Sequence, residues 1–213
     1  VIDSAAFDHP HADLRRAARL VVERRAEMRL SDLNWGRLNT WRGLVACFWD
    51  VPEYRPHLDA LESVEIEYAP SSHAPEEIAA QSLLVAGWLA SHLGWRVERP
   101  CAREGAIYRA ALAAGGRAIN LELRAGEAAA CASVRRVRFV GGAAEFEARA
   151  DEGGARLATS ARIGDAPQIG RVVTYEPRTE GQRLGRELGI LARDDAYESA
   201  LAAAAQLLPA EVQ

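Results

Sequence analysis

The chain contains no lysine, and all 26 of its basic residues are arginine. A lysine Schiff base and the lysine of a phosphate-binding G-x-x-x-x-G-K loop are therefore excluded. Cysteine is also scarce: Cys47, Cys101 and Cys131 lie far apart and form no C-x-x-C motif. An odd number of scattered cysteines favours a reducing compartment over a disulfide framework. We therefore expect a cytoplasmic protein with free thiols.

Long apolar runs and an excess of positive charge are missing too. The longest apolar run, Leu83 to Ala90, is far shorter than the roughly 20 residues that span a bilayer. The 30 acidic residues outnumber the arginines and give a formal charge of −4, which argues against nucleic acid or an anionic membrane as the main partner. The chain of 213 residues is 49% hydrophobic, enough for one large or two small globular domains.

Local catalytic patterns such as G-x-S-x-G and H-E-x-x-H are absent from the sequence. The segment Asp8-His9-Pro10-His11-Ala12-Asp13 imitates a metal site, with two imidazoles and two carboxylates close together. A helix-initiating turn with Pro10 near the first turn explains the same residues. We therefore predict no catalytic residue, no metal site, no cofactor and no enzyme activity.

Periodicity predicts strand, helix and strand in the first part of the chain. Val1–Asp3 has strand composition, and Leu14, Ala17, Ala18 and Val21 share one face of a following helix. Residues Ser63–Tyr68 alternate apolar and polar side chains, as a half-buried strand does. We expect the two strands to lie side by side and parallel, joined by a right-handed crossover. A further helix is predicted from Pro75 to about His92.

Residues Leu30 to Tyr68 hold three of the five tryptophans and the least ordinary polar residues of the chain. Apolar side chains recur there at helical spacing, which predicts two short helices with a break at Asn39-Thr40. Large aromatics and planar donors share neighbouring faces, as in buried polar networks and in binding hot spots. The candidate residues, for partner binding or for a supporting network, are Asp32, Asn34, Trp35, Arg37, Trp41 and Arg42. The sequence leaves both roles open.

Three diglycines, at positions 115–116, 141–142 and 153–154, predict two-residue hairpin turns in an antiparallel meander. The resulting registers place apolar opposite apolar residues and charge opposite counter-charge. They pair Arg109 with Glu122, Arg138 with Glu145, Val137 with Phe146, and Glu145 with Arg162. After the meander, a capping box at Thr179–Gln182 predicts one helix, and Asp194-Asp195 predicts the cap of a last helix.

One face of this meander is charged. Its residues are Arg109, Glu122, Arg124, Arg136, Arg138, Glu145, Glu147 and Arg162. Cross-strand ion pairs that keep a sheet soluble explain such a face, and a polar docking surface is the alternative.

The motif S-D-L-N-W-G-R-L-N-T-W-R at positions 31–42, then F-W-D-V-P-E-Y-R-P and S-V-E-I-E-Y, resembles the glucose-6-phosphate dehydrogenase assembly protein family, also called OpcA. V-I-D-S-A-A-F-D at the amino end and G-W-L-A-S-H-L-G-W around Trp88 support the resemblance. Members of that family are usually longer at the amino end, so this chain resembles their later part.

We therefore predict a mixed α/β fold. Residues 1–94 form an α/β part with parallel strand-helix-strand character, and residues 95–213 form an antiparallel meander covered by helices, either separately or as one compact unit. The resemblance implies a non-catalytic assembly factor or allosteric activator that binds glucose-6-phosphate dehydrogenase and supports NADPH production. The alternative is a sensor or enzyme that holds a sugar phosphate with arginine side chains.

Overall fold

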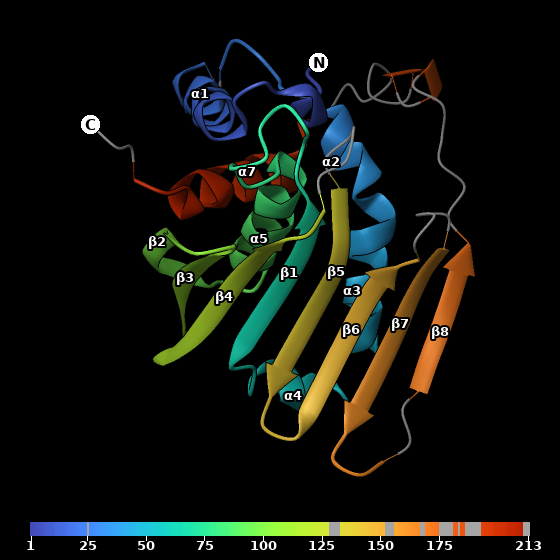
Figure 1. The fold of residues 1–213 in the computed structure, drawn as a ribbon. Coiled ribbons are helices and arrows are strands. Elements are labelled where there is room, and N and C mark those ends of the chain that lie inside the picture. Colours follow the sequence, from blue (N-terminus) through green and yellow to red (C-terminus); the bar gives the residue numbers. More distant parts are fainter. Residues whose placement is uncertain are drawn as a thin grey trace.

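The computed structural model describes residues 1–24, 26–127, 133–151, 156–166, 169–174, 181–182, 184–185 and 193–210. Eight strands form one sheet in the order β2-β3-β4-β1-β5-β6-β7-β8 (Figure 1). Their bounds are β1 Ser63–Ala69, β2 Arg96–Glu104, β3 Ile107–Ala114, β4 Arg117–Ala125, β5 Ser133–Gly141, β6 Ala144–Ala150, β7 Arg156–Ile163 and β8 Ile169–Thr174. Strand β1 runs parallel to β4, and the other neighbouring pairs are antiparallel. The predicted mixed α/β fold is confirmed.

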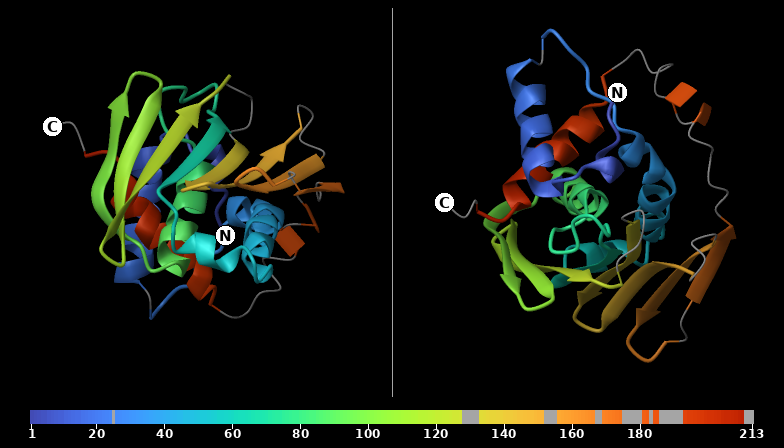
Figure 2. Two further views of the ribbon diagram at one scale, coloured as in Figure 1. Left: turned by 90° about the horizontal axis from the view of Figure 1, so that it is seen from below. Right: turned by 45° about the horizontal axis from the view of Figure 1, so that its top comes forward.

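The helices of the described residues lie on one side of this sheet (Figure 2). Their bounds are η1 Ser4–Ala6, α1 Pro10–Glu23, α2 Leu33–Arg37, α3 Asn39–Asp50, α4 Arg55–Leu58, α5 Ala80–His92 and α7 Asp195–Leu207. Helix α5 packs on β1 and β5, α3 packs on β6 and β7, and α7 packs along α5. Within the described part of the chain, no helix has the length and apolar character needed to cross a bilayer.

Helix α5 is buried on nearly every side because the sheet, α7 and α2 surround it. Its close packing on α7 requires Gly87, where a Cβ would clash with the backbone of Ala200 and Ala204. The helix ends at His92 as predicted, but it begins at Ala80 rather than at Pro75. The reason is a set of tertiary contacts: His11 Nε2 accepts from the Ile78 N–H at 2.8 Å, which holds this segment in a turn.

The predicted strand Val1–Asp3 does not enter the sheet, and that prediction is wrong. Both edges of β1 are already occupied, by β4 and by β5. Ile2 instead forms an isolated parallel bridge with Asp32, with its N–H on the Ser31 carbonyl at 2.8 Å and its carbonyl accepting from Leu33 N–H at 2.9 Å. The parallel pair of the fold is β1 with β4.

The hairpin registers around Arg109–Glu122 and Glu145–Arg162 are confirmed. The register around Arg138 is wrong by two residues, since Arg138 lies opposite Glu147 and Phe139 lies opposite Phe146.

The register differs from the prediction because Gly141 is needed within strand β5. A Cβ at this position would clash with the backbone of Ala60 and Leu61. Gly141 therefore lies in β5, where its missing side chain lets the backbone of Ala60 and Leu61 come close. Gly142, with a φ of 55°, then begins the turn. Because the shift is even, each side chain keeps its predicted face.

The remaining predictions concern short helices. The Trp-rich stretch forms α2 and α3, and the break falls at Leu38, one residue before the predicted position. Asp194 caps α7 as predicted, and its side chain accepts from the Tyr197 N–H. The predicted capping box at 179–182 and the diglycine at 153–154 fall wholly or partly outside the described residues.

Candidate functional site

The centre of the candidate site is a buried carboxylate. Asp32 is 1% exposed and lies directly before α2. Its Oδ1 accepts from the Ser4 N–H at 3.0 Å and from the Asn34 N–H at 2.9 Å, and its Oδ2 accepts from Ser4 Oγ at 2.6 Å. Burial raises the pKa of Asp32 although these hydrogen bonds lower it. Asp32 thus joins the amino-terminal turn to α2.

Two amides extend this network towards the sheet. Asn34 donates from Nδ2 to Ser4 Oγ at 3.0 Å and accepts at Oδ1 from Gln81 Nε2 at 3.1 Å. Gln81 then accepts at Oε1 from the Val134 N–H at 2.7 Å. We call Ser4, Asp32, Asn34 and Gln81 the buried polar network. It connects α2, α5 and β5, which are far apart in sequence.

The network and Trp35 both contact the last helix, where the Tyr197 hydroxyl donates to Asp32 Oδ2 at 3.5 Å. Trp35 Nε1 donates to Asp194 Oδ2 at 2.9 Å, and the Trp35 ring lies against that of Tyr197 with centroids 5.7 Å apart. The Arg42 guanidinium lies over the Trp35 ring at 3.6 Å, close enough for a cation–π interaction. The Trp35 contacts fix the last helix to the Trp-rich stretch.

Arg37 and Trp41 lie apart from these contacts. Arg37 forms a two-pronged ion pair with Asp3, with N–O distances of 2.5 and 2.7 Å, and its side chain is 19% exposed. Trp41 is 8% exposed and belongs to the hydrophobic core. The structure therefore brings Asp32, Asn34, Trp35 and Arg42 together.

Three buried residues that contact the candidate residues were not predicted as site residues from the sequence: Ser4, Gln81 and Tyr197. Gln81 and Ser82 interrupt an otherwise apolar segment, and a buried amide in such a place needs partners. This interruption of the apolar segment could have identified Gln81 as part of a buried polar network. Ser4 and Tyr197 carry no comparable signal, because a serine in a turn and a tyrosine in an amphipathic helix are ordinary.

The opposite side of the sheet, which no described helix covers, forms a second candidate surface. Arg138 donates to Glu145 at 2.9 Å and to Glu65 at 3.1 Å, and Glu145 also pairs with Arg162 at 2.5 Å. Arg109 binds Glu122 at 2.9 Å. We call this surface the ionic face; its residues are Glu65, Glu67, Glu104, Arg109, Glu122, Arg124, Arg136, Arg138, Glu145, Glu147, Arg149 and Arg162.

The charges of the ionic face balance, with six arginines against six glutamates. Its guanidinium groups lower the pKa of Glu145 to about 2, mainly through the hydrogen bond from Arg138. The pKa of Glu122 is likewise lowered by Arg109 and Arg124, against the opposing effect of burial. Each of the six arginines already has a glutamate beside it, so this face offers little unpaired positive charge to an anion.

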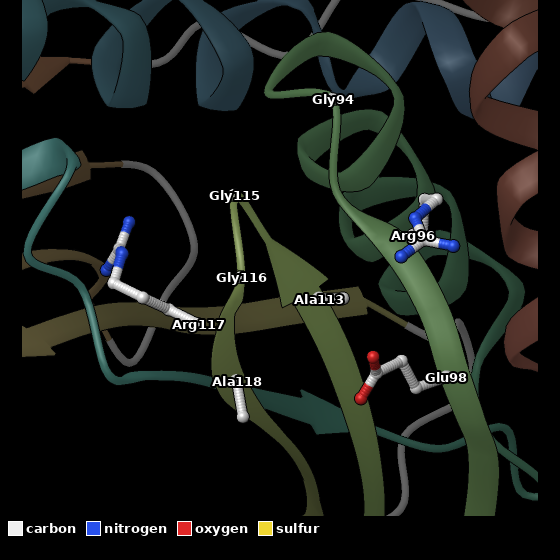
Figure 3. A pocket seen from close by; sticks show the side chains of 8 residues that line it. All are labelled: Gly94, Arg96, Glu98, Ala113, Gly115, Gly116, Arg117 and Ala118. Carbon is white, nitrogen blue, oxygen red and sulfur yellow. The ribbon is translucent and has the colours of Figure 1, made fainter.

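A cavity of about 360 Å³ lies beside the turn between β3 and β4. Arg96 and Arg117 line it, but their guanidinium groups lie on opposite sides of the Gly115-Gly116 turn (Figure 3). The Glu98 carboxylate also lines the cavity. Two arginines that do not converge, together with a carboxylate, make a poor phosphate site.

A smaller groove of about 190 Å³ separates α3 from the end strands β7 and β8. Leu44, Phe48, Val51 and Tyr54 line one side of it, and Ile169 with its neighbours lines the other. Cys47 also borders this groove and is an exposed free thiol, whereas Cys101 is buried. Burial raises the pKa of Cys101 to about 12, so its reactive thiolate is scarce at neutral pH. Cys131 lies outside the described residues.

Among the described residues, no group of three or more His, Cys, Asp and Glu side chains is placed to hold a metal ion. In the segment that imitates such a site, His11 instead accepts the Ile78 N–H. Burial lowers the pKa of His11, which favours the neutral imidazole that this hydrogen bond needs. His11 therefore has a structural partner.

The sequence profile of a known family, described as the C-terminal domain of a glucose-6-phosphate dehydrogenase subunit, matches residues 28–201. This range includes α2, α3, the whole sheet and the start of α7. The match therefore covers most of the elements described above.

Curated relatives named "Putative OxPP cycle protein OpcA" are similar over a shorter range. The protein of Synechocystis is 37% identical over 95 residues, and that of Nostoc punctiforme is 40% identical over 96 residues. These alignments cover 45% of this chain and 18% and 19% of the two relatives. The chain thus spans about a fifth of the length of the curated relatives it matches.

Solved structures give weaker similarity. An inositol dehydrogenase homologue from Azotobacter vinelandii is 13% identical, with a TM-score of 0.41, covering 98% of this chain and 59% of that chain. The Gal80p super-repressor mutant from Saccharomyces cerevisiae is 7% identical, with a TM-score of 0.48, covering 86% of this chain and 55% of that chain. At this level the likeness carries no argument about function.

Proposed function

The chain belongs to the family defined by the C-terminal domain of a glucose-6-phosphate dehydrogenase subunit, and on this basis we propose that it binds glucose-6-phosphate dehydrogenase. It acts there as a non-catalytic assembly factor or allosteric activator, and so supports NADPH production in the oxidative pentose phosphate cycle. The observation that carries the proposal is the family match over residues 28–201. The names of the curated relatives refer to the same cycle.

The physical mechanism is linkage between binding and conformation. A subunit that binds one conformation or oligomer of the enzyme more tightly than another shifts the population by its differential affinity. No residue of this chain needs to touch the substrate. The gain in enzyme activity is then largest under conditions in which the enzyme alone rarely adopts the state that this protein binds.

We assign two roles to the candidate residues. Asp32, Asn34, Trp35 and Trp41 are buried and act as a scaffold that holds α2 and α3 in place. Arg37 and Arg42 are partly exposed, and they are the members of the set that can reach a partner. This division follows from burial, since a contact residue must present surface before binding.

A non-catalytic role agrees with the state of the side chains that could do chemistry. Asp32 is held by four hydrogen-bond donors, and the Cys101 thiol is buried with a raised pKa. The proposal also places the protein in the cytoplasm, since the described cysteines Cys47 and Cys101 are free thiols.

The test is a titration of purified cognate glucose-6-phosphate dehydrogenase with the full-length protein at limiting glucose 6-phosphate. We expect a higher rate or a shift in oligomeric state, and no turnover by the protein alone. Arg37→Ala should weaken activation and, because it removes the ion pair with the partly exposed Asp3, should cost about 1 kcal/mol of stability. Trp41→Ala should lose about 3 to 5 kcal/mol. An unchanged saturation curve together with an unchanged oligomeric state would refute the proposal.

A thermal-shift measurement separates this proposal from the sugar-phosphate alternative. A ligand at a hundred times its dissociation constant adds roughly 2.7 kcal/mol of stability. We expect glucose 6-phosphate and NADP to leave the melting temperature of this protein unchanged when no enzyme is present. A clear increase would favour the alternative.

A further inference from the structure

The two edge strands of the sheet are built differently. Strand β2 carries Pro100, five charged residues among nine, and two register irregularities against β3. These are devices by which natural sheets prevent an edge from pairing with another strand. Strand β2 is therefore a protected edge.

Strand β8 has neither a proline nor a register irregularity, and it has less charge. Its sequence I-G-R-V-V-T contains no proline and a single charge, Arg171, and its pairing with β7 is regular from Ile169 to Thr174. Ile169 and Val172 are both 66% exposed although they are β-branched and apolar. Among the described residues, β8 has a hydrogen-bonded strand on one side only. Such an edge is ready to accept another strand.

The apolar groove between α3 and strands β7 and β8 lies next to this edge. Ile169, Gly170 and Arg171 line one side of it, and Phe48 of α3 and Val51, which follows α3, line the other. A strand added beside β8 would place alternate side chains on the helix side of the sheet, next to this groove of about 190 Å³. Backbone pairing would give affinity, and the groove would select the side chain.

We propose that the free edge of β8 binds an extended segment of the partner enzyme as a ninth strand of the sheet, with an apolar side chain of that segment directed to the groove under α3. The proposal rests on the proposed function, which supplies the partner. The bound segment has apolar residues at alternate positions and an acidic residue near Arg171, which has no ion pair with any described residue.

Charge argues against a second copy of this chain as the occupant. Two β8 strands related by a twofold axis must pair residues of the same face. If the two copies of β8 overlap along most of their length, Arg171 lies directly opposite, or diagonal to, the Arg171 of the other copy. Like charges at these positions destabilise a strand pair, whereas a partner strand with an acidic residue there does not meet this cost.

The test measures binding of the full-length protein to purified glucose-6-phosphate dehydrogenase. Ile169→Asp and Arg171→Glu should each raise the dissociation constant at least tenfold. Arg99→Glu makes the same charge change on the protected edge β2 and should stay within twofold of the unaltered protein. Thermal unfolding of each free variant checks folding, and the exposure of Ile169 and Arg171 predicts little change.

Hydrogen exchange separates strand addition from a side-chain contact. Backbone amides of residues 169–174 should exchange at least tenfold more slowly in the complex, while those of β2 should not change. Tight binding that neither variant alters, with no protection of β8, would overturn the edge proposal and leave the proposed function intact. If the unaltered protein does not bind the enzyme, both the edge proposal and the proposed function are wrong. If instead the variants dissociate a dimer of this protein, the edge belongs to a second copy and the proposal is wrong.

Discussion

The buried polar network and the ionic face use the same chemistry in opposite surroundings. In the network, Asp32 is 1% exposed, and the donors around it are two backbone N–H groups and the hydroxyls of Ser4 and Tyr197. On the ionic face, side chains such as Arg162 and Arg149 are 55% and 67% exposed. A buried polar group that loses its hydrogen-bond partner has no water to replace it, so the full free-energy cost of its desolvation remains. At the surface, water takes the place of the lost partner. Burial therefore decides which polar contacts the fold depends on.

The two regions also differ in what they join. Network contacts connect residues that are distant in sequence, such as Asn34 with Gln81 and Gln81 with Val134. The ionic face mostly connects neighbouring strands that the backbone already holds together. Loss of a network contact should thus loosen the packing of α2 and α5, while loss of an ion pair should leave the sheet intact.

The largest difference is expected at the two carboxylates at the centres of these regions. Asp32→Ala should lower the unfolding free energy by about 3 to 5 kcal/mol, because it leaves the Ser4 and Asn34 donors buried without an acceptor. Glu145→Ala, the matched change on the ionic face, should cost less than about 1 kcal/mol. Urea unfolding of both variants measures the two values. Equal losses would show that burial does not separate the two regions.

A smaller difference is expected between two amides. Gln81→Leu removes the acceptor of the Val134 N–H and the donor to Asn34, and should cost about 1 to 3 kcal/mol. Asn120→Leu changes an exposed amide of β4 on the opposite side of the sheet, and should stay within about 0.5 kcal/mol. Chemical denaturation of the pair tests this. A stability loss for Asn120→Leu as large as that for Gln81→Leu would contradict it.

The sequence predicts those features that depend on local pattern. Helix faces, the two hairpin registers around Arg109 and Arg162, and the cap at Asp194 follow from periodicity and turn chemistry. The failures at Val1–Asp3, Gly141 and Pro75 share one cause: each segment is held by a partner that is distant in sequence. Tertiary contacts override local preference at such places.

The candidate site was predictable in part for the same reason. Unusual composition drew attention to Asp32, Asn34 and Trp35. Asn34 is hydrogen-bonded to Asp32, and Trp35 is joined to Asp32 through Tyr197. Their partners Ser4 and Tyr197 come from opposite ends of the chain, and no local pattern marks them. The free edge of β8 was also beyond prediction, since an edge strand is defined by sheet order.

Opposite pH dependences should also separate the two regions. The pKa of Glu145 is lowered to about 2 in the folded protein, so its stabilising contribution is present above the unfolded pKa and is lost as the pH falls from about 4.5 to about 2. Burial raises the pKa of Asp32, so its contribution is fully present below the unfolded pKa and is lost as the pH rises through the folded pKa.

Two isosteric variants measure these signs. Relative to the unaltered protein, Asp32→Asn should become more stable as the pH rises through the folded pKa of Asp32, and Glu145→Gln should become less stable as the pH rises between about 2 and about 4.5. The Glu145 effect should stay below about 1 kcal/mol because the side chain is partly solvated. Urea unfolding at a series of pH values gives the slopes. Slopes of the same sign would contradict the assigned pKa directions.

The smallest expected effect is the coupling within one ion pair of the ionic face. A double-mutant cycle on Arg138 and Glu145, which lie 2.9 Å apart, should give about 0.2 to 1 kcal/mol at low salt. Raising the salt from about 0.1 M to about 1 M shortens the screening length from about 10 Å to about 3 Å, so the coupling should shrink. A cycle on Ser4 and Asp32 should not respond to salt, because these side chains are buried. A coupling above about 2 kcal/mol that resists salt would mean that the ionic face is covered in solution, which favours the docking interpretation over ion pairs that keep the sheet soluble.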